Sequence, residues 1–458
     1  LRDTEPELHL RSVTLTAKDK ICLCETRECT PEACPYANGY YARIKGALWD
    51  VLDVPCLTAE TLQEYAERHM VCPFELGLDS SLWSDVIIGD YNYLFDPVVH
   101  LVRFFESAGD YIFLVDEAHN LPGRAREMHS AALTKTSFYE AKKLLGKGKS
   151  SLKNTLTKVN DVFIEWRHRA EEETAARDGR FGKTFFLKER SEEFDHLLNR
   201  LCEPLEAWLD DHREPDETHT ALLQLYFDVR AWLRVADTFD DHFVLQITAS
   251  GSEVRAAQLC LDPSAFLADS FALGRAAVLF SATLAPASYY KDLCGVPEAR
   301  AVALRSPFPA GNQGLFCIGN VSTRYKDRDA SLAIVAESLA TMVRARCGNY
   351  LAFFPSYAYM EQAYAQFKEH CPEINCIKQE NAMDEQQKAA FLAQFVPGPS
   401  QPLLGFAVMG GVFGEGVDLT GDRLIGVGIV GPGLPQVGPR QEQLRDYFER
   451  TRGSGFDY

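Results

Sequence analysis

Short runs of apolar residues, each bounded by polar residues, recur along this chain and constrain its fold more than any other feature. They comprise residues 111–115, 278–280, 350–354, 404–408 and 424–430, and the start of the segment 85–95. Runs of this kind are typical of strands buried in a parallel sheet. Helical patterns, such as those of residues 331–345 and 358–370, lie between them. Alternating strands and helices predict an α/β protein.

The chain of 458 residues is long enough for about three domains. Residues 122–225 carry charged helical patterns and no convincing strand, so we predict a helical insertion there. Residues 1–121 and 226–295 are then the two parts of a first α/β domain, with a second insertion near residues 20–75. Residues 296–458 form the second α/β domain.

Composition is ordinary for a globular protein, with 46% hydrophobic and 24% charged residues. No apolar run is long enough to span a membrane, so no membrane partner is expected. The net charge of −18 argues against a nucleic-acid partner. However, residues 141–160 contain six lysines and no acidic residue, so a local basic surface remains compatible with one.

Thirteen cysteines are too few for a disulfide scaffold in a chain of this length, but four of them lie between Cys22 and Cys34. Such clustering indicates metal binding in a reducing compartment, and we predict a cytoplasmic protein. Both zinc and iron–sulfur clusters accept four thiolates, so spacing alone leaves both open. The absence of a Cys-x-x-Cys pair disfavours an ordinary zinc ribbon.

The most informative motif, Asp116-Glu117-Ala118-His119, follows an apolar run. The carboxyl ends of strands are where α/β sheets place their ligands. There Asp116 can hold Mg²⁺ through water, Glu117 can orient and deprotonate an attacking water, and His119 can relay the nucleotide state. The alternative interpretation is an acidic loop without a catalytic role.

Two further segments follow apolar runs. Ser281 and Thr283 can bridge the carboxylate loop to a moving domain, although residues of this type also cap helices. Residues 410–418 form a glycine-rich loop, and glycine lets the backbone approach a phosphate or a base closely. Its candidate functional residues are Gly414, Glu415, Gly416 and Asp418. A flexible loop is the alternative.

In this order the three motifs resemble those of the XPD/DinG family, the iron–sulfur DNA helicases of superfamily 2. Segments 84–97, 261–264 and 348–357 add to the resemblance, which covers nearly the whole chain. The resemblance implies two RecA-like motor domains with parallel sheets, an iron–sulfur insertion and an arch-like helical insertion. It also implies an enzyme that uses ATP and Mg²⁺ to move 5′→3′ along single-stranded DNA and to open duplex junctions.

The resemblance further implies DNA contacts from the segment around Tyr91 and Tyr93, because aromatic side chains stack on bases without sequence preference. Phe354 and Tyr357 belong to the equivalent segment of the second motor domain. Packing at the end of a strand is the alternative for these aromatic residues.

Members of this family carry four cysteines ahead of the Tyr-Asn-Tyr block, the last of them followed by proline and an aromatic residue. Cys72 matches that last position, and Cys29 and Cys34 match inner positions. Cys22 is our choice for the first position, with Cys24 a close competitor. The resemblance thus implies a [4Fe-4S] cluster.

Two family elements are missing. No G-x-x-x-x-G-K-[ST] phosphate loop precedes Asp116, and no Gln-x-x-Gly-Arg-x-x-Arg segment follows Asp418 to supply an arginine finger. Since the chain begins with Leu1 rather than Met, we expect both to lie in a larger protein from which this chain derives. The alternatives are a non-catalytic DNA-binding remnant with a structural metal cluster and a metal-binding interaction module. The second alternative leaves the Asp116 motif unexplained.

Overall fold

The structure is a computed structural model that describes residues 9–146, 150–176, 182–214, 216–433 and 438–455. It contains two compact units, one made of residues 1–302 and 438–458 and the other of residues 303–437. Each unit is described by itself below.

The first unit contains two small parallel sheets. In one, β1 (Ser12–Thr14) lies between β2 (Cys56–Leu57) and β3 (Val86–Ile88). In the other, β4 (Ile112–Val115) pairs with β9 (Ala276–Leu279). Parallel pairing of these short strands confirms the predicted α/β class.

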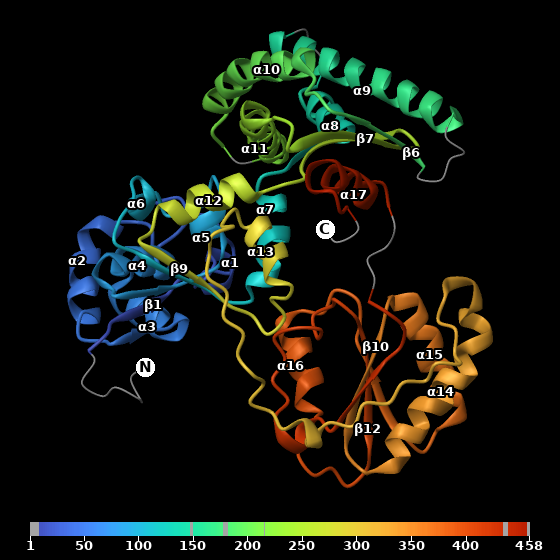
Figure 1. Ribbon diagram of the computed structural model, residues 1–458. Helices are drawn as coiled ribbons and strands as arrows, with labels where there is room; N and C mark the ends of the chain where they lie inside the picture. The colour runs from blue at the N-terminus through green and yellow to red at the C-terminus, as the bar shows by residue number, and fades with distance from the viewer. Residues whose placement is uncertain (1–8, 147–149, 177–181, 215, 434–437, 456–458) are drawn as a thin grey trace. The chain divides into compact units, whose positions relative to one another are not determined.

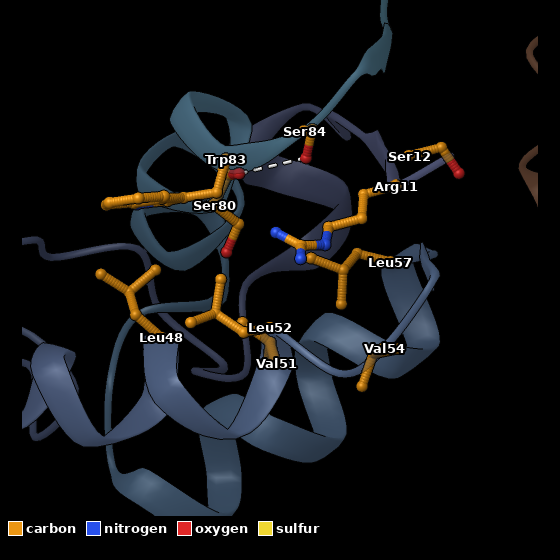
Figure 2. Close-up of a pocket in the computed structure, with 10 residues that line it drawn as sticks. All are labelled: Arg11, Ser12, Leu48, Val51, Leu52, Val54, Leu57, Ser80, Trp83 and Ser84. Carbon is orange, nitrogen blue, oxygen red and sulfur yellow. Dashed lines mark hydrogen bonds between the residues drawn. The ribbon is translucent and has the colours of Figure 1, made fainter. Parts of the chain in front are cut away.

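Helices of the cysteine-bearing segment lie between β1 and β3 in sequence. They are α1 (Lys18–Ile21), α2 (Tyr40–Val51), α3 (Ala59–His69) and α4 (Pro73–Ser80), followed by the 3₁₀ helix η1 (Ser81–Trp83). Their apolar faces share a core with Val13 of β1. Figure 2 shows a small cavity here, between α2 and the η1 segment, where Ser84 donates a hydrogen bond to the Ser80 carbonyl oxygen. Its volume of about 10 Å³ suits no more than a single water molecule.

Short helices flank the β4–β9 pair and leave one face of it exposed. They are α5 (Asn92–Phe95), α6 (Val102–Phe105), η2 (Ala118–Asn120), α7 (Leu121–Met128), α12 (Ser264–Ala272) and α13 (Ala287–Leu293). Phe95 of α5, Leu121 of α7 and Leu267 of α12 meet in one buried cluster with Val115 of β4. This cluster fixes the helices that flank the end of β4.

An antiparallel sheet forms the base of the helical insertion. Its order is β5 (Ala131–Thr134), β8 (Glu253–Cys260), β7 (Phe243–Ser250) and β6 (Lys183–Leu187). In Figure 1 one face is covered by α8 (Lys135–Leu144), α9 (Ser151–Ala176), α10 (Glu192–Asp211) and α11 (Glu217–Thr238). The apolar side chains of these helices form the largest core of the unit.

Strands β5 and β6 differ from our expectation of helices alone in residues 122–225. Both are short, and each pairs with a distant strand: β5 with β8 and β6 with β7. Each partner lies more than 50 residues further along the chain. A strand this short gives little pattern, because its stability comes from pairing with distant partners. The predicted boundary at residue 225 stays a prediction, although the sheet continues to Cys260.

Helix α17 (Pro439–Arg452) covers the opposite face of this sheet (Figure 1). Tyr447 and Phe448 pack on Val244 and Leu259, which alternate along β7 and β8 with the residues that face α8–α11. In sequence α17 lies within the predicted second motor domain, residues 296–458, but it packs in the first unit.

The second unit is a parallel sheet with helices on both faces. The strand order is β11 (Asn375–Lys378), β12 (Leu403–Val408), β10 (Asn349–Phe354) and β13 (Gly426–Ile429). In Figure 1, α16 (Glu385–Ala393) lies on one side, and α14 (Arg328–Ala345) and α15 (Tyr357–His370) lie on the other. The unit also contains the 3₁₀ helices η3 (Ala310–Asn312), η4 (Tyr325–Asp327) and η5 (Gly421–Arg423).

All of the apolar runs were predicted to be buried strands, but their burial differs even within the second unit, where Val427 and Ile429 of β13 are 46% and 70% exposed. Strand β12 is buried along its whole length, as predicted. In the first unit, Ile112 and Leu114 are 63% and 68% exposed, and Val278 and Phe280 are exposed beside them. Among the described residues, therefore, no layer covers this face of the β4–β9 pair.

Candidate active site

The loops after β4 and β9 leave the same edge of the sheet because the two strands run parallel. Phe280 donates its backbone N–H to the Val115 carbonyl oxygen at 3.0 Å, and Ala118 donates to the Phe280 carbonyl oxygen at 3.1 Å. These two bonds tie the Asp116–His119 loop to the Ser281–Thr283 loop.

Ser281 is the central side chain of this edge. Its hydroxyl lies 2.8 Å from His119 Nδ1 and donates to Glu117 Oε2 at 3.3 Å. A hydroxyl has one proton, so a Ser281 that donates to Glu117 accepts from an Nδ1–H of His119. Thr283 joins the group through its backbone N–H, which donates to Ser281 Oγ at 3.2 Å. The structure thus brings four predicted site residues together.

Glu117 carries the exposed charge of the group. Its side chain is 60% exposed, whereas that of His119 is 19% exposed. Asp116 Oδ1 accepts the backbone N–H of Glu117 at 2.7 Å, and Glu117 itself has a φ of 45°. That φ lies in the left-handed region, which non-glycine residues seldom adopt. Two carboxylates therefore lie side by side at the open edge of the sheet, in reach of a ligand in solution.

Tyr91 and Tyr93, predicted as DNA contacts, are both partly buried, and Tyr91 lies beside this edge whereas Tyr93 packs against the core of the cysteine-bearing segment. The Tyr91 hydroxyl donates to the backbone carbonyl oxygens of Asp116 and Glu117. The ring of Tyr93 packs against Gly89, where a Cβ would lie 2.7 Å from it. Their role in DNA binding stays a prediction.

Phe354 corrects one of our predictions. It is 0% exposed and stacks on Phe406 in the core of the second unit, with 5.7 Å between the ring centroids. A ring without exposed surface is a packing residue, so Phe354 is withdrawn as a DNA contact. Tyr357 is partly exposed, and its hydroxyl accepts a hydrogen bond from Gln379 Nε2 at 2.7 Å.

The glycine-rich loop follows β12 in the second unit. Gly416 has a φ of 70°, which favours glycine, and Gly414 donates its N–H to the Gly411 carbonyl oxygen at 2.8 Å. The Asp418 carbonyl oxygen accepts from Arg423 at 3.5 Å. Glu415 lies in the same loop, between the two candidate glycines. A ligand-binding role for these four residues stays a prediction.

A cavity of about 260 Å³ lies in the cysteine-bearing segment. The thiols that line it belong to Cys22, Cys24, Cys29, Cys34 and Cys72. Cys24 Sγ lies 3.8 Å from Cys34 Sγ. All four predicted ligands and the competitor Cys24 therefore surround one space, although Cys72 is 38 residues from Cys34 in sequence.

Burial and the neighbouring thiols Cys34 and Cys22 raise the pKa of Cys24 to about 11. Burial also raises the pKa of Cys72, while the backbone N–H groups of Glu75 and Phe74 and the charge of Lys18 act in the opposite direction. Thiols bind metals only as thiolates, so metal binding here would release protons. Within the described part of the chain, no three His, Cys, Asp or Glu side chains converge closely enough to hold a single metal ion.

Comparison with known proteins identifies the family of this chain. Residues 7–138 match a protein family described as DEAD_2, and residues 339–458 match one described as Helicase C-terminal domain. The two matches together cover more than half of the chain. This chain belongs to the XPD/DinG-like helicases of superfamily 2. The predicted family is thus confirmed.

Individual helicases of this family are distant relatives. The ATP-dependent DNA helicase CHL1 of Coccidioides immitis is 21% identical over 455 residues, which cover 86% of this chain and 52% of that protein. The XPD helicase subunit of general transcription and DNA repair factor IIH from Schizosaccharomyces pombe is 23% identical over 383 residues, which cover 68% of this chain and 49% of that protein. The chain spans about half the length of these relatives.

A solved structure titled XPD_Helicase superposes with a TM-score of 0.56 at 18% identity and covers 97% of this chain and 76% of the solved chain. This similarity supports the fold of two RecA-like domains with insertions. None of the described helices is both long and apolar enough to cross a membrane.

Sequence reasoning missed two side chains that order the helicase motifs. The sequence indicates Tyr91 only as a DNA contact, without its bonds to the carboxylate loop, and it gives no indication of a role for Gln379. Gln379 accepts the Val408 N–H at 3.0 Å and donates to Tyr357, so it ties the end of β12 to α15. A lone glutamine after a short strand carries no sequence signal for such a role.

Lys147 and Lys149 of the predicted basic stretch lie outside the described residues.

Proposed function

We propose that the complete protein is an ATP-dependent DNA helicase that translocates 5′→3′ on single-stranded DNA and opens duplex junctions. The observation that carries the proposal is the hydrogen-bonded group of Glu117, Ser281 and His119 at the ends of two parallel strands. We place the protein in the cytoplasm, in keeping with its unpaired cysteines.

In this mechanism Asp116 would hold Mg²⁺, which would neutralise phosphate charge, and Glu117 would accept the proton of the water that attacks the γ-phosphate. Ser281 orients the Glu117 carboxylate, and His119 and Thr283 bind Ser281 in turn. A change in the charge of the nucleotide would therefore reach the loop after β9 through hydrogen bonds. In the second unit, the loop of Gly414, Glu415, Gly416 and Asp418 would contact nucleotide or DNA.

The phosphate loop and the arginine finger would come from parts of the complete protein outside this chain. The exposed apolar side chains of β4 and β9, Ile112, Leu114 and Val278, support this proposal. A further strand ending in a phosphate loop would bury them and bring backbone N–H groups to the same edge as Glu117.

The test is Glu117→Gln in the complete protein. The amide keeps the shape of the carboxylate but accepts no proton, and removal of a general base typically costs ~10²–10⁴ in rate. DNA-stimulated ATP hydrolysis should fall by that factor, while nucleotide affinity, measured by fluorescence titration, should change little. Asp116→Asn should weaken Mg²⁺-nucleotide binding as well. Near-normal turnover of Glu117→Gln would show that these roles are misassigned.

We also propose a [4Fe-4S] cluster in the cysteine-lined cavity, held by Cys29, Cys34, Cys72 and either Cys22 or Cys24. The five thiols give the donor set that such a cluster needs. A cavity of about 260 Å³ exceeds the ~30 Å³ share of one water many times, so it suits a group of atoms better than a single ion. The cluster would cross-link the helices of this segment.

A further inference from the structure

Tyr91 contacts the two carboxylate residues through their backbone rather than through their side chains. Its hydroxyl donates to the carbonyl oxygen of Glu117 at 2.9 Å and also to that of Asp116. We propose that Tyr91 is a positioning residue that holds the Asp116–Glu117 backbone in the conformation needed for hydrolysis. This inference rests on the proposed function, because it assumes that Glu117 is the general base.

The backbone at Glu117 needs such support. Its φ of 45° places a residue with a Cβ in the left-handed region, which persists only where the surroundings hold it. Because Tyr91 supplies one hydroxyl proton to two neighbouring carbonyl oxygens, it binds both sides of the strained residue. Without that bond, Glu117 is freer to relax to a right-handed conformation, which would turn its carboxylate away from Ser281.

Tyr91 is itself held firmly. It precedes α5, and its ring packs edge-on against Phe95, with 6.2 Å between the centroids. Phe95 is buried and packs on Phe271 of α12 at 5.4 Å. On the other side, Asp90 accepts the N–H of Asn92 at 3.1 Å. A buried aromatic contact therefore fixes the point from which the hydroxyl donates.

The hydroxyl remains a donor over the whole physiological range. Burial, and then the negative charges of Asp116, Glu117 and Asp90, raise the pKa of Tyr91. Arg124 of α7 lies 3.7 Å from Asp90. Its positive charge lowers the pKa of Tyr91, but this effect is smaller than the others. The segment that carries Tyr91 is thus attached both to the carboxylate loop and to the helix that follows it.

The Tyr91 hydroxyl therefore connects segment 84–97 to the backbone of Glu117, the proposed general base. A movement of α5, for example when DNA binds beside it, would move the Tyr91 hydroxyl and with it the backbone of Glu117. The geometry gives a direct route by which occupancy of the DNA path would change the rate of hydrolysis, without any contact between DNA and nucleotide.

The experiment compares Tyr91→Phe with wild type in the complete protein. The variant keeps the ring and removes only the hydroxyl. We expect kcat of DNA-stimulated ATP hydrolysis to fall about ten- to hundredfold, since small misplacements of catalytic groups cost up to ~10²-fold. The KM for ATP and the Kd for single-stranded DNA should stay within about twofold, because the residues that bind them are unchanged. Tyr111→Phe is the matched control, because Tyr111 lies at the opposite end of β4 and should keep wild-type kinetics.

Hydrogen exchange on this chain gives a second measurement that needs no activity. The amides of Glu117 and Ala118 should exchange faster in Tyr91→Phe than in wild type or Tyr111→Phe. Wild-type kcat in Tyr91→Phe would overturn the inference, as would a loss of DNA affinity that matched the loss of kcat. If Glu117→Gln also retained turnover, the proposed function would fail. If only Tyr91→Phe did, the positioning role alone would fail.

Discussion

Phe354 at the end of β10 and Tyr357 at the start of α15 have different surroundings, although only three positions separate them. Phe354 is fully buried against Phe406, whereas Tyr357 begins α15 and is partly exposed. Both belong to a segment that resembles a DNA-tracking region, so sequence alone treats them alike. Burial separates a ring that is enclosed in the core from a ring that packs on the core but keeps exposed surface.

Phe354→Ala should therefore destabilise the second unit. Removal of a buried aromatic side chain typically costs ~3–5 kcal/mol, because a cavity remains. Chemical denaturation of this chain, monitored by far-ultraviolet circular dichroism, measures the loss in free energy of unfolding. The control is Val427→Ala on β13, a residue that is 46% exposed and should change stability by less than ~0.5 kcal/mol. Unchanged stability together with weaker DNA binding in Phe354→Ala would return this residue to the DNA contacts.

Helix α4 is the element that presents Cys72 to the cysteine-lined cavity. Cys72 is the N-cap residue of α4, and Pro73 occupies the first turn, where a missing N–H does no harm. The N–H groups of Phe74 and Glu75 favour a thiolate at Cys72, as helix N-termini generally do. One turn of helix thus places this sulfur and partly offsets the rise in its pKa that burial causes.

We predict that the cysteine-lined cavity holds iron. Anaerobically purified protein should be brown, with about four irons and four sulfides per chain. Cys72→Ser should release them and loosen residues 20–75 to proteolysis, since binding at such a site is also local folding energy. Cys56→Ser is the matched control, because Cys56 is an exposed cysteine of β2 outside the cavity. Stoichiometric zinc without iron in the wild-type protein would refute the cluster.

The whole chain combines an acidic net charge of −18 with a half-complete set of helicase motifs. Phosphoryl transfer needs charge neutralised from several sides at once, and among the known elements only Asp116 and Glu117 are present here. The 458 residues contain no G-x-x-x-x-G-K-[ST] segment before Asp116 and no Gln-x-x-Gly-Arg-x-x-Arg segment after Asp418, the two motifs that we expect to supply the phosphate cradle and the arginine finger. DNA contacts need fewer parts, because stacking and scattered cationic side chains act separately.

This chain by itself should hydrolyse no ATP and should bind single-stranded DNA weakly. Absence of an arginine finger alone costs ~10³–10⁵ in rate, which leaves activity hard to detect. A DNA-stimulated ATPase assay tests the first point, and turnover of about one per second, typical of competent motors, would contradict it. A binding titration at two salt concentrations tests the second. Affinity should fall as salt rises, because phosphate contacts release counterions.

The sequence by itself determined the class of the fold and the order of the motifs. Asp116-Glu117-Ala118-His119 is a local signal, because a short apolar run followed by two carboxylates needs no distant partner to be recognised. The strands β4, β9, β10, β12 and β13 were predicted for the same reason. Four of the five cysteines that line the cavity lie within Cys22–Cys34, so their proximity was visible in the sequence, whereas their role as ligands stays a prediction.

Only the tertiary structure decided which distant side chains meet. Ser281 reaches His119 across 162 positions because β4 and β9 are parallel neighbours. Tyr91 contacts the carboxylate loop because α5 packs on α12, and β6 exists because β7 pairs with it. The physical reason is the same in each case. Hydrogen bonds and burial depend on distances in space, and residue order determines those distances only within single helices, strands and turns.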